Sequence, residues 1–167
     1  MAASTGASLS ASALAGLATL SGPRHGGATA AVRTFAAEAA QLGPRAAIAN
    51  RLVEDRALPG FGHMLYPDDD PRAAALLERF EPPPELQALR EAVQAVAGLA
   101  PNVDFALMAA SQALRLPSDA PFALFLVARC AGWIAHAIEQ GQADVLIRPR
   151  ARYVEPPPRS SQDPGSR

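Results

Sequence analysis

The chain has 167 residues, of which 49% are hydrophobic and 19% charged, and its formal net charge at pH 7 is −1. This length gives room for one ordinary domain or parts of two, and the apolar fraction excludes global disorder. The near-neutral charge gives no reason to expect nucleic acid or an anionic membrane as a partner, and the single cysteine, Cys130, excludes a disulfide framework or a cysteine-rich zinc site.

The N-terminal stretch resembles a secretory signal only in being rich in alanine, serine and leucine. Its first charge is Arg24, so no positive region precedes the apolar residues, which alternate with serine, threonine and glycine. No uninterrupted apolar run reaches the ~20 residues that a membrane span needs. We therefore expect a soluble, untargeted chain in the cytoplasm, with no membrane partner.

Helical periodicity recurs along the chain, and no segment shows convincing strand alternation. The first helix is expected from about Ser8 to Leu20, ended by Gly22-Pro23. The apolar positions that define the next four helices are Val32, Phe35, Ala36 and Ala39, then Ala47, Ile48 and Leu52 after Pro44, then Ala73, Leu76, Leu77 and Phe80 after Pro71, and finally Leu86, Leu89, Val93 and Val96 after Pro84.

Two further helices and a tail complete the chain. A sixth helix is expected from about Asn102 to Arg115, and a seventh from Ser118, as its N-cap, to Gln140. The proline- and serine-rich residues 154–167 have nothing to bury and are predicted to be a disordered tail. The predicted fold class is all-α.

Two histidine-bearing segments are not explained by periodicity. Gly22 to Gly27 places His25 in a glycine-flanked turn, which is either an incidental helix connection or a place where backbone approaches an anionic ligand. The longer loop from Pro59 to Arg72 holds His63 among glycines, and a loop of this length tends to bind something. Within it, Asp70 is interpreted as the N-cap of the following helix, because the acidic run lacks calcium-loop spacing.

Two charged side chains on helices leave alternatives open. Asp104 falls in the first turn of a helix, where it is either a simple response to the helix dipole or a carboxylate base. Arg129 shares one stripe of the seventh helix with Phe122, Phe125 and Trp133, so it either forms a structural ion pair or snorkels, or faces a buried anion. His136, on the same stripe, is interpreted as a surface residue.

Taken together and in this order, these segments resemble the citrate synthase family. The family's GPxHGGANE, PGFGHxxYxxxDPR, PNVDF and RPRxxY motifs are similar to the segments that begin at Gly22, Pro59, Pro101 and Arg148, and the match runs from about Leu9 to Tyr153. The resemblance implies an all-α fold with its active site between two domains. Residues 1–26 and 116–153 would belong to the large domain and 27–115 to the small domain.

The resemblance also implies the chemistry: acetyl-CoA, a co-substrate and not a bound cofactor, condenses with oxaloacetate to citrate, as in the tricarboxylic acid cycle, and no metal is implied. Asp104 would remove a proton from the thioester methyl group, His25 would donate to the thioester oxygen, and His63 would polarise the ketone. Oxaloacetate carboxylates would be bound by Arg72 and Arg129, and by Arg148 of a neighbouring subunit in a homodimer. The CoA-contacting backbone would be that of Leu58, Pro59, Gly60, Phe61 and Gly62.

The chain also departs from the family's pattern. An upstream histidine segment of the HxDHExNAST kind is absent, so we expect a truncated start at Met1 and a missing N-terminal segment or partner subunit. The asparagine and glutamate that follow GGA in the family are Thr29 and Ala30 here, and Met64 replaces a common basic residue. The leading hypothesis is an enzyme that forms citrate or 2-methylcitrate. The alternatives are a non-catalytic fragment that binds CoA or a dicarboxylate, and a plain helical dimerisation module.

Overall fold

The computed structural model describes residues 1–22 and 26–152. Its elements are the 3-10 helix η1 (Ala2–Thr5) and the helices α1 (Leu9–Leu20), α2 (Ala28–Leu42), α3 (Pro44–Val53), α4 (Pro71–Leu77), α5 (Pro84–Ala97), α6 (Val103–Ala113) and α7 (Ala120–Ala143). No strand is present in this part of the chain, and only an isolated bridge joins Phe61 to Pro101. The prediction of an all-α fold is confirmed.

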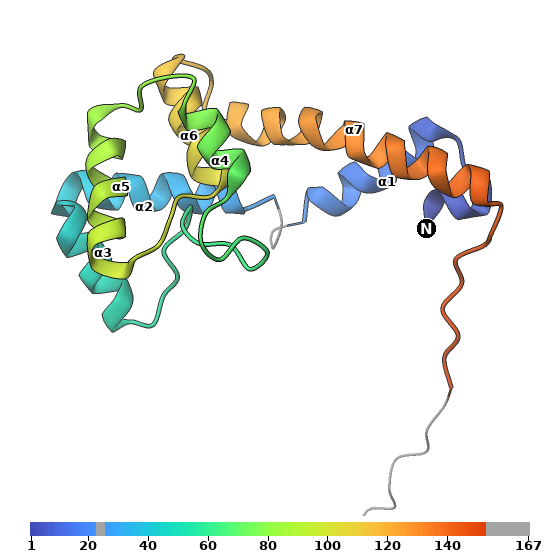
Figure 1. Ribbon diagram of the computed structural model, residues 1–167, viewed down its shortest axis with the longest axis horizontal. Helices are drawn as coiled ribbons and strands as arrows, with labels where there is room; N and C mark the ends of the chain where they lie inside the picture. The colour runs from blue at the N-terminus through green and yellow to red at the C-terminus, as the bar shows by residue number, and fades with distance from the viewer. Residues whose placement is uncertain (23–25, 153–167) are drawn as a thin grey trace, which may run out of the picture.

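The helices form a body and an arm (Figure 1). Helices α2 to α6 pack against one another as the body, whereas α7 leaves the body and runs along α1 and η1 as the arm. The boundaries fall close to the predicted residues 26 and 116, but the assignment of the two parts to a small and a large citrate synthase domain stays a prediction. The predicted tail lies outside the described residues.

Capping side chains and first-turn prolines explain where most of the predicted helices begin. The side chains of Ser8, Asp70 and Asn102 accept backbone N–H groups in the first turns of α1, α4 and α6. Proline stands in the first turn of α3, α4, α5 and α7, where its missing N–H has no cost. The predicted N-cap of α7 is wrong: α7 begins after Asp119, and the carbonyl of Ser118 instead accepts a hydrogen bond from Arg33 at 2.9 Å.

The core lies inside the body. Phe35, Phe61 and Phe105 meet at its centre, with ring centroids 6.3 Å apart for Phe35 and Phe61 and 5.0 Å apart for Phe61 and Phe105. Aliphatic side chains of α2, α3, α5 and α6 surround them, so the loop that carries Phe61 is anchored in the same cluster. Burial of this kind contributes roughly 25 cal/mol per Å² of apolar surface, which makes the body the stable part of the chain.

A buried ion pair joins α2 to α3. Arg51 is 5% exposed, donates from Nε and Nη2 to Glu38 at 2.8 and 2.7 Å, and lies 4.6 Å from the centre of the Phe35 ring. Its Nη1 donates to the carbonyl of Ala57 at 3.4 Å. The pair therefore ties the two helices to the start of the loop that leads to Phe61.

The arm is much less covered than the body. Helix α7 has 24 residues, and an 18-residue window within it has a mean hydropathy of 1.5. Only 11% of that window is buried, and by length and composition the helix could span a membrane. Core helices of soluble proteins pass the same test. The expectation that no membrane is involved therefore stays a prediction.

Candidate active site

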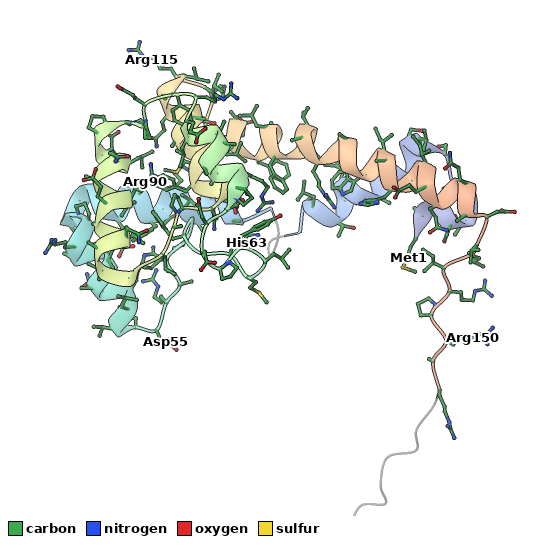
Figure 2. All side chains as sticks on the ribbon, viewed as in Figure 1. Met1, Asp55, His63, Arg90, Arg115 and Arg150 are labelled. Atoms are coloured by element: carbon green, nitrogen blue, oxygen red, sulfur yellow. The ribbon has the colours of Figure 1, made fainter. Side chains whose placement is uncertain are left out.

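A cleft of about 230 Å³ lies where the body meets the arm. Five helices and two loops contribute to it, and its lining consists of Leu20, Gly26, Ala28, Thr29, His63, Arg72, Val103, Asp104, Phe122 and Phe125. Figure 2 shows His63 on the side of the body that faces the arm. The cleft brings together three of the predicted site residues, His63, Arg72 and Asp104, which come from a loop and two different helices.

A backbone hydrogen bond fixes the tautomer of His63. Its Nδ1 accepts the N–H of Leu65 at 3.1 Å, which assigns the proton of the neutral ring to Nε2. The ring also packs on Tyr66, with centroids 5.0 Å apart and planes inclined at 36°. The half-buried imidazole therefore has an N–H donor available for a ligand oxygen.

Arg72 is oriented by Asp70. Asp70 accepts from Arg72 Nε at 2.9 Å and from Nη2 at 2.8 Å, and the guanidinium carbon lies 5.1 Å from the centre of the Tyr66 ring. The hydrogen bonds to Asp70 raise the pKa of Arg72 further above its ordinary value, and Asp104 also raises it by charge attraction. A permanently charged fork at the cleft suits a ligand carboxylate.

Asp70 itself is buried and fully used as an acceptor. Besides Arg72 Nε and Nη2, it accepts the backbone N–H of Arg72 at 3.1 Å and that of Val103 at 3.0 Å. Burial raises the pKa of this carboxyl, but the hydrogen bonds and the charge of Arg72 outweigh it and leave the pKa below its ordinary value. Its predicted role as N-cap of α4 is confirmed, while its bond to α6 was not predicted.

Asp104 stands in the first turn of α6, next to the cleft. Asn102 caps this turn by accepting the N–H groups of Asp104 at 3.0 Å and Phe105 at 3.4 Å. The positive end of the helix dipole favours a carboxylate there, so the electrostatic explanation of Asp104 holds. It also lines the cleft and acts by charge on Arg72, and its role as a base stays a prediction.

The predicted CoA-contacting segment, Leu58 to Gly62, is fixed to the start of α6. The N–H of Asn102 donates to the carbonyl of Gly60 at 2.8 Å, and Asn102 Nδ2 donates to the carbonyl of Gly62 at 3.0 Å. The side chains of Leu58 and Phe61 are buried in the core at 6% and 7% exposure. These two side chains are therefore not available to a ligand in this conformation, and the contact of the segment with CoA stays a prediction.

Arg129 lies outside the cleft that Arg72 lines. It lines a groove of about 730 Å³ between α1 and α7, together with Trp133 and His136, and Leu20 borders both this groove and the cleft. Arg129 itself is exposed, whereas Phe122, Phe125 and Trp133 on the same stripe of α7 are half-buried. Its guanidinium forms no ion pair within the described part of the chain. His136 is exposed, as predicted, and pairs with Glu139 at 3.0 Å.

Two predicted residues cannot be placed in the cleft. His25 lies outside the described residues, although its neighbour Gly26 lines the cleft. Arg148 is exposed on the segment that follows α7, close in sequence to Arg150, which Figure 2 shows well away from the body. The roles predicted for these two residues, and for Arg129, stay predictions.

Some residues in or next to the cleft were given no role by sequence reasoning. Tyr66 does not line the cleft but contacts both His63 and Arg72, and its place between them in the loop is the signal that could have assigned it a supporting role. Phe122 and Phe125 were noted only for their helical spacing, but they line the apolar side of the cleft. Among residues 1–22 and 26–152, no group of three or more histidine, cysteine, aspartate or glutamate side chains could hold a metal.

Comparison with known proteins agrees with this geometry. The family model for the citrate synthase C-terminal domain matches residues 1–150. The citrate synthase of Haloferax volcanii is 36% identical over 83% of this chain and 40% of its own length, and 2-methylcitrate synthase 2 of Corynebacterium glutamicum is 36% identical over 80% and 38%. The chain belongs to the citrate synthase family.

Solved structures lead to the same assignment. Citrate synthase from Thermotoga maritima superposes with a TM-score of 0.73 at 33% identity, over 93% of this chain and 46% of its own. The enzyme from Thermoplasma acidophilum, solved as a ternary complex with carboxymethyl coenzyme A and oxaloacetate, gives 0.72 at 31% identity over 95% and 47%. This chain thus spans a little under half the length of these relatives.

Proposed function

We propose that this chain supplies one side of the active site of a citrate synthase-type enzyme. The observation that carries the proposal is the convergence of His63, Arg72 and Asp104 on one cleft at the junction of body and arm. A donor, a cation and a carboxylate are the groups that condensation of a thioester with a keto dicarboxylate requires. The family membership of the chain supports the same reaction.

The chemistry assigns a separate task to each group. Arg72 binds a carboxylate of oxaloacetate, and the Nε2–H of His63 donates to the ketone oxygen, which makes the ketone carbon more electrophilic. Asp104 removes a proton from the methyl carbon of the thioester, and that carbon forms a bond to the ketone carbon. As this bond forms, the C=O π bond breaks and the ketone oxygen takes the proton from Nε2 of His63 to become a hydroxyl. His25 is assigned, by resemblance, the donor role at the thioester oxygen. Hydrolysis of the citryl thioester then releases CoA as a free thiol.

The acyl substrate and the cellular setting belong to the same proposal. The Haloferax relative supports acetyl-CoA, and the Corynebacterium relative supports propionyl-CoA as the competing substrate. Acetyl-CoA is proposed because the family model and most of the relatives named above are citrate synthases. We place the enzyme in the cytoplasm, as a homodimer in which Arg148 reaches a neighbouring subunit.

A second candidate is a non-catalytic fragment that binds CoA or a dicarboxylate and pairs with a partner chain. The exposed position of Arg129 favours it, because this carboxylate ligand is separated from Arg72 in the chain on its own. On this view, the remaining half of the citrate synthase fold completes the site. The two candidates differ in whether the purified chain releases thiol by itself.

The decisive experiment is a thiol-release assay on the purified 167-residue chain with oxaloacetate and either acetyl-CoA or propionyl-CoA. Activity that is abolished by Asp104→Ala, while oxaloacetate binding measured by calorimetry is nearly unchanged, supports the enzyme. Oxaloacetate binding without release supports the binding fragment. A chain that neither binds oxaloacetate nor releases thiol contradicts both candidates for the isolated chain.

A further inference from the structure

One buried carboxylate, Asp70, connects two of the helices that form the cleft. It is 2% exposed and stands at the N-terminus of α4, where it caps the first turn through the N–H of Arg72. Its Oδ2 atom accepts the N–H of Val103, 33 residues further along the chain and in the first turn of α6. The starts of α4 and α6 are therefore attached to the same side chain.

The same carboxylate also sets the direction of a substrate-binding group. It accepts from Arg72 Nε and Nη2, and this two-point contact fixes the plane of the guanidinium. Tyr66 supports the guanidinium from its ring face. With Nε and one Nη2 hydrogen directed at Asp70, the remaining guanidinium hydrogens are the ones left to meet a ligand. Arg72 is 42% exposed at its side chain, so these hydrogens are accessible.

We propose that Asp70 is a positioning residue that holds the carboxylate-binding Arg72 and the base Asp104 in one fixed relation. Arg72 is held directly through its side chain. Asp104 is held through Val103, which precedes it in the first turn of α6. The two residues act on different substrates, so a single rigid link between them sets the distance between the bound keto acid and the proton that is removed. This inference rests on the proposed function.

The ordinary explanation, that Asp70 is only a helix cap, makes a different prediction. A cap needs one acceptor oxygen, and asparagine serves as well as aspartate at that position. Asp70→Asn keeps the oxygen that caps the N–H of Arg72 and replaces Oδ2 with an NH₂ group. That group faces the N–H of Val103 and Arg72 Nη2, so donors meet donors and both contacts are lost. Arg72 Nε keeps Oδ1 as its acceptor, but this oxygen now belongs to a neutral amide, so the charged two-point contact becomes a weaker one-point contact. The variant thus separates the cap from the link.

The experiment compares the full wild-type chain with Asp70→Asn and with a control variant, Asp69→Asn. Asp69 is the exposed neighbour of Asp70, and its substitution removes the same charge. In ¹⁵N-labelled protein, the Nε–H of Arg72, identified by its disappearance in Arg72→Lys, reports the two-point contact through its exchange rate with water. The amide signals of Val103 and Asp104 report the start of α6. Steady-state kinetics give kcat and the KM for each substrate.

We expect Asp70→Asn to speed exchange of the Arg72 Nε–H by about tenfold or more and to shift the Val103 and Asp104 amides, while Asp69→Asn does neither. In kinetics, the KM for oxaloacetate should rise and kcat should fall, each by about tenfold, with the KM for acyl-CoA unchanged within about twofold. A change in oxaloacetate KM without a change in kcat would overturn the link to Asp104.

Two other results would overturn the whole inference. Equal behaviour of Asp70→Asn and Asp69→Asn in the exchange measurement would show that the contacts do not orient Arg72. A general loss of dispersed signals, with no change specific to Arg72 and α6, would show that Asp70 acts only in stability. Absence of turnover in all the proteins, including wild type, counts against the proposed function, and the exchange comparison alone then decides the role of Asp70.

Discussion

At the scale of single residues, both the backbone conformation and the small space available require glycine at position 60. Its φ is +88°, and a Cβ there would lie 3.1 Å from the Cβ of Phe105 and from both methyl groups of Val32. We expect Gly60→Ala to lower the free energy of unfolding by ~2–4 kcal/mol, from left-handed strain together with overpacking. Chemical denaturation measures this cost.

Gly98 is the matched control for this prediction. Its φ is +67°, but nothing lies within 4 Å of the position of a Cβ. Gly98→Ala should therefore show the backbone strain alone, ~1–2 kcal/mol. Equal costs at the two glycines would mean that the Phe105 and Val32 contacts yield without penalty and that the loop is less tightly packed than the structure shows.

The ionisation of Asp70 makes the free energy of unfolding depend on pH. Because its folded-state pKa is below the ordinary value of 3.8, folding releases a proton from this carboxyl near that pH. Its contribution to stability is fully present above about pH 4. The contribution is lost as the pH falls through the lower, folded-state pKa.

The comparison of wild type with Asp70→Asn tests this sign. The wild type should be the more stable protein at pH 7 and 5, and its advantage should shrink steadily below about pH 4. Urea midpoints at pH 7, 5, 4 and 3 measure it. An advantage that stays constant down to pH 3 would contradict a lowered pKa for Asp70.

At the scale of elements, the contact between α1 and α7 depends on a glycine. A Cβ on Gly16 would lie 2.6 Å from Cδ2 of Trp133 and under 3 Å from two other ring atoms. We expect Gly16→Ala to push the two helices apart and to change the emission of Trp133, the only tryptophan in the chain. The melting temperature should fall as well, because the arm loses packing contacts.

Gly141 provides the control on the same arm. No atom lies within 4 Å of a Cβ at this position, which is inside α7. Gly141→Ala should leave Trp133 emission unchanged and raise stability slightly, by up to ~1 kcal/mol, because alanine favours the helix. Unchanged emission in Gly16→Ala would show that α1 does not pack on Trp133 in solution.

The elements were predictable from sequence because their ends are chemically marked. Proline at the first position of α3, α4 and α5, and the caps Ser8, Asp70 and Asn102, set helix starts within a residue or two of the structure. The error at Ser118 arose because two residues that favour caps, Ser118 and Asp119, stand together. Asp119 is the N-cap, so the helix begins one residue later than predicted, at Ala120, and Pro121 lies in its first turn. The η1 turn was missed because its residues show no apolar period.

At the scale of the whole molecule, the cleft was only partly predictable. His63 and Arg72 belong to one loop and its following helix, so their proximity follows from short sequence distance. Asp104 joins them through the packing of α4 on α6, which periodicity does not reveal. The resemblance to citrate synthases supplied that pairing. The separation of Arg129 from the cleft depends on how α7 leaves the body, which no local pattern encodes.

The exposed stripe of α7 determines how the whole chain should behave in solution. Leu124, Val127, Ile134 and Ile138 recur at helical spacing and are 41%, 71%, 39% and 45% exposed. Soluble proteins usually cover an apolar stripe of this extent, either with another part of the same chain or with a partner. This chain matches 40% of the length of the Haloferax relative and 46% of the Thermotoga structure, so most of each of these proteins has no counterpart in it.

We therefore expect the isolated chain to self-associate through the arm. Sedimentation should show species larger than the 17.4 kDa monomer, whose proportion rises with concentration. Replacing Val127 and Ile134 together by glutamate should shift the chain towards monomer, because burial of two carboxylates in such a contact is unfavourable. Val53→Glu, at an 87% exposed apolar site on the body, should leave association unchanged. A chain that is monomeric at every concentration would contradict this prediction and show that the arm tolerates water on its apolar face.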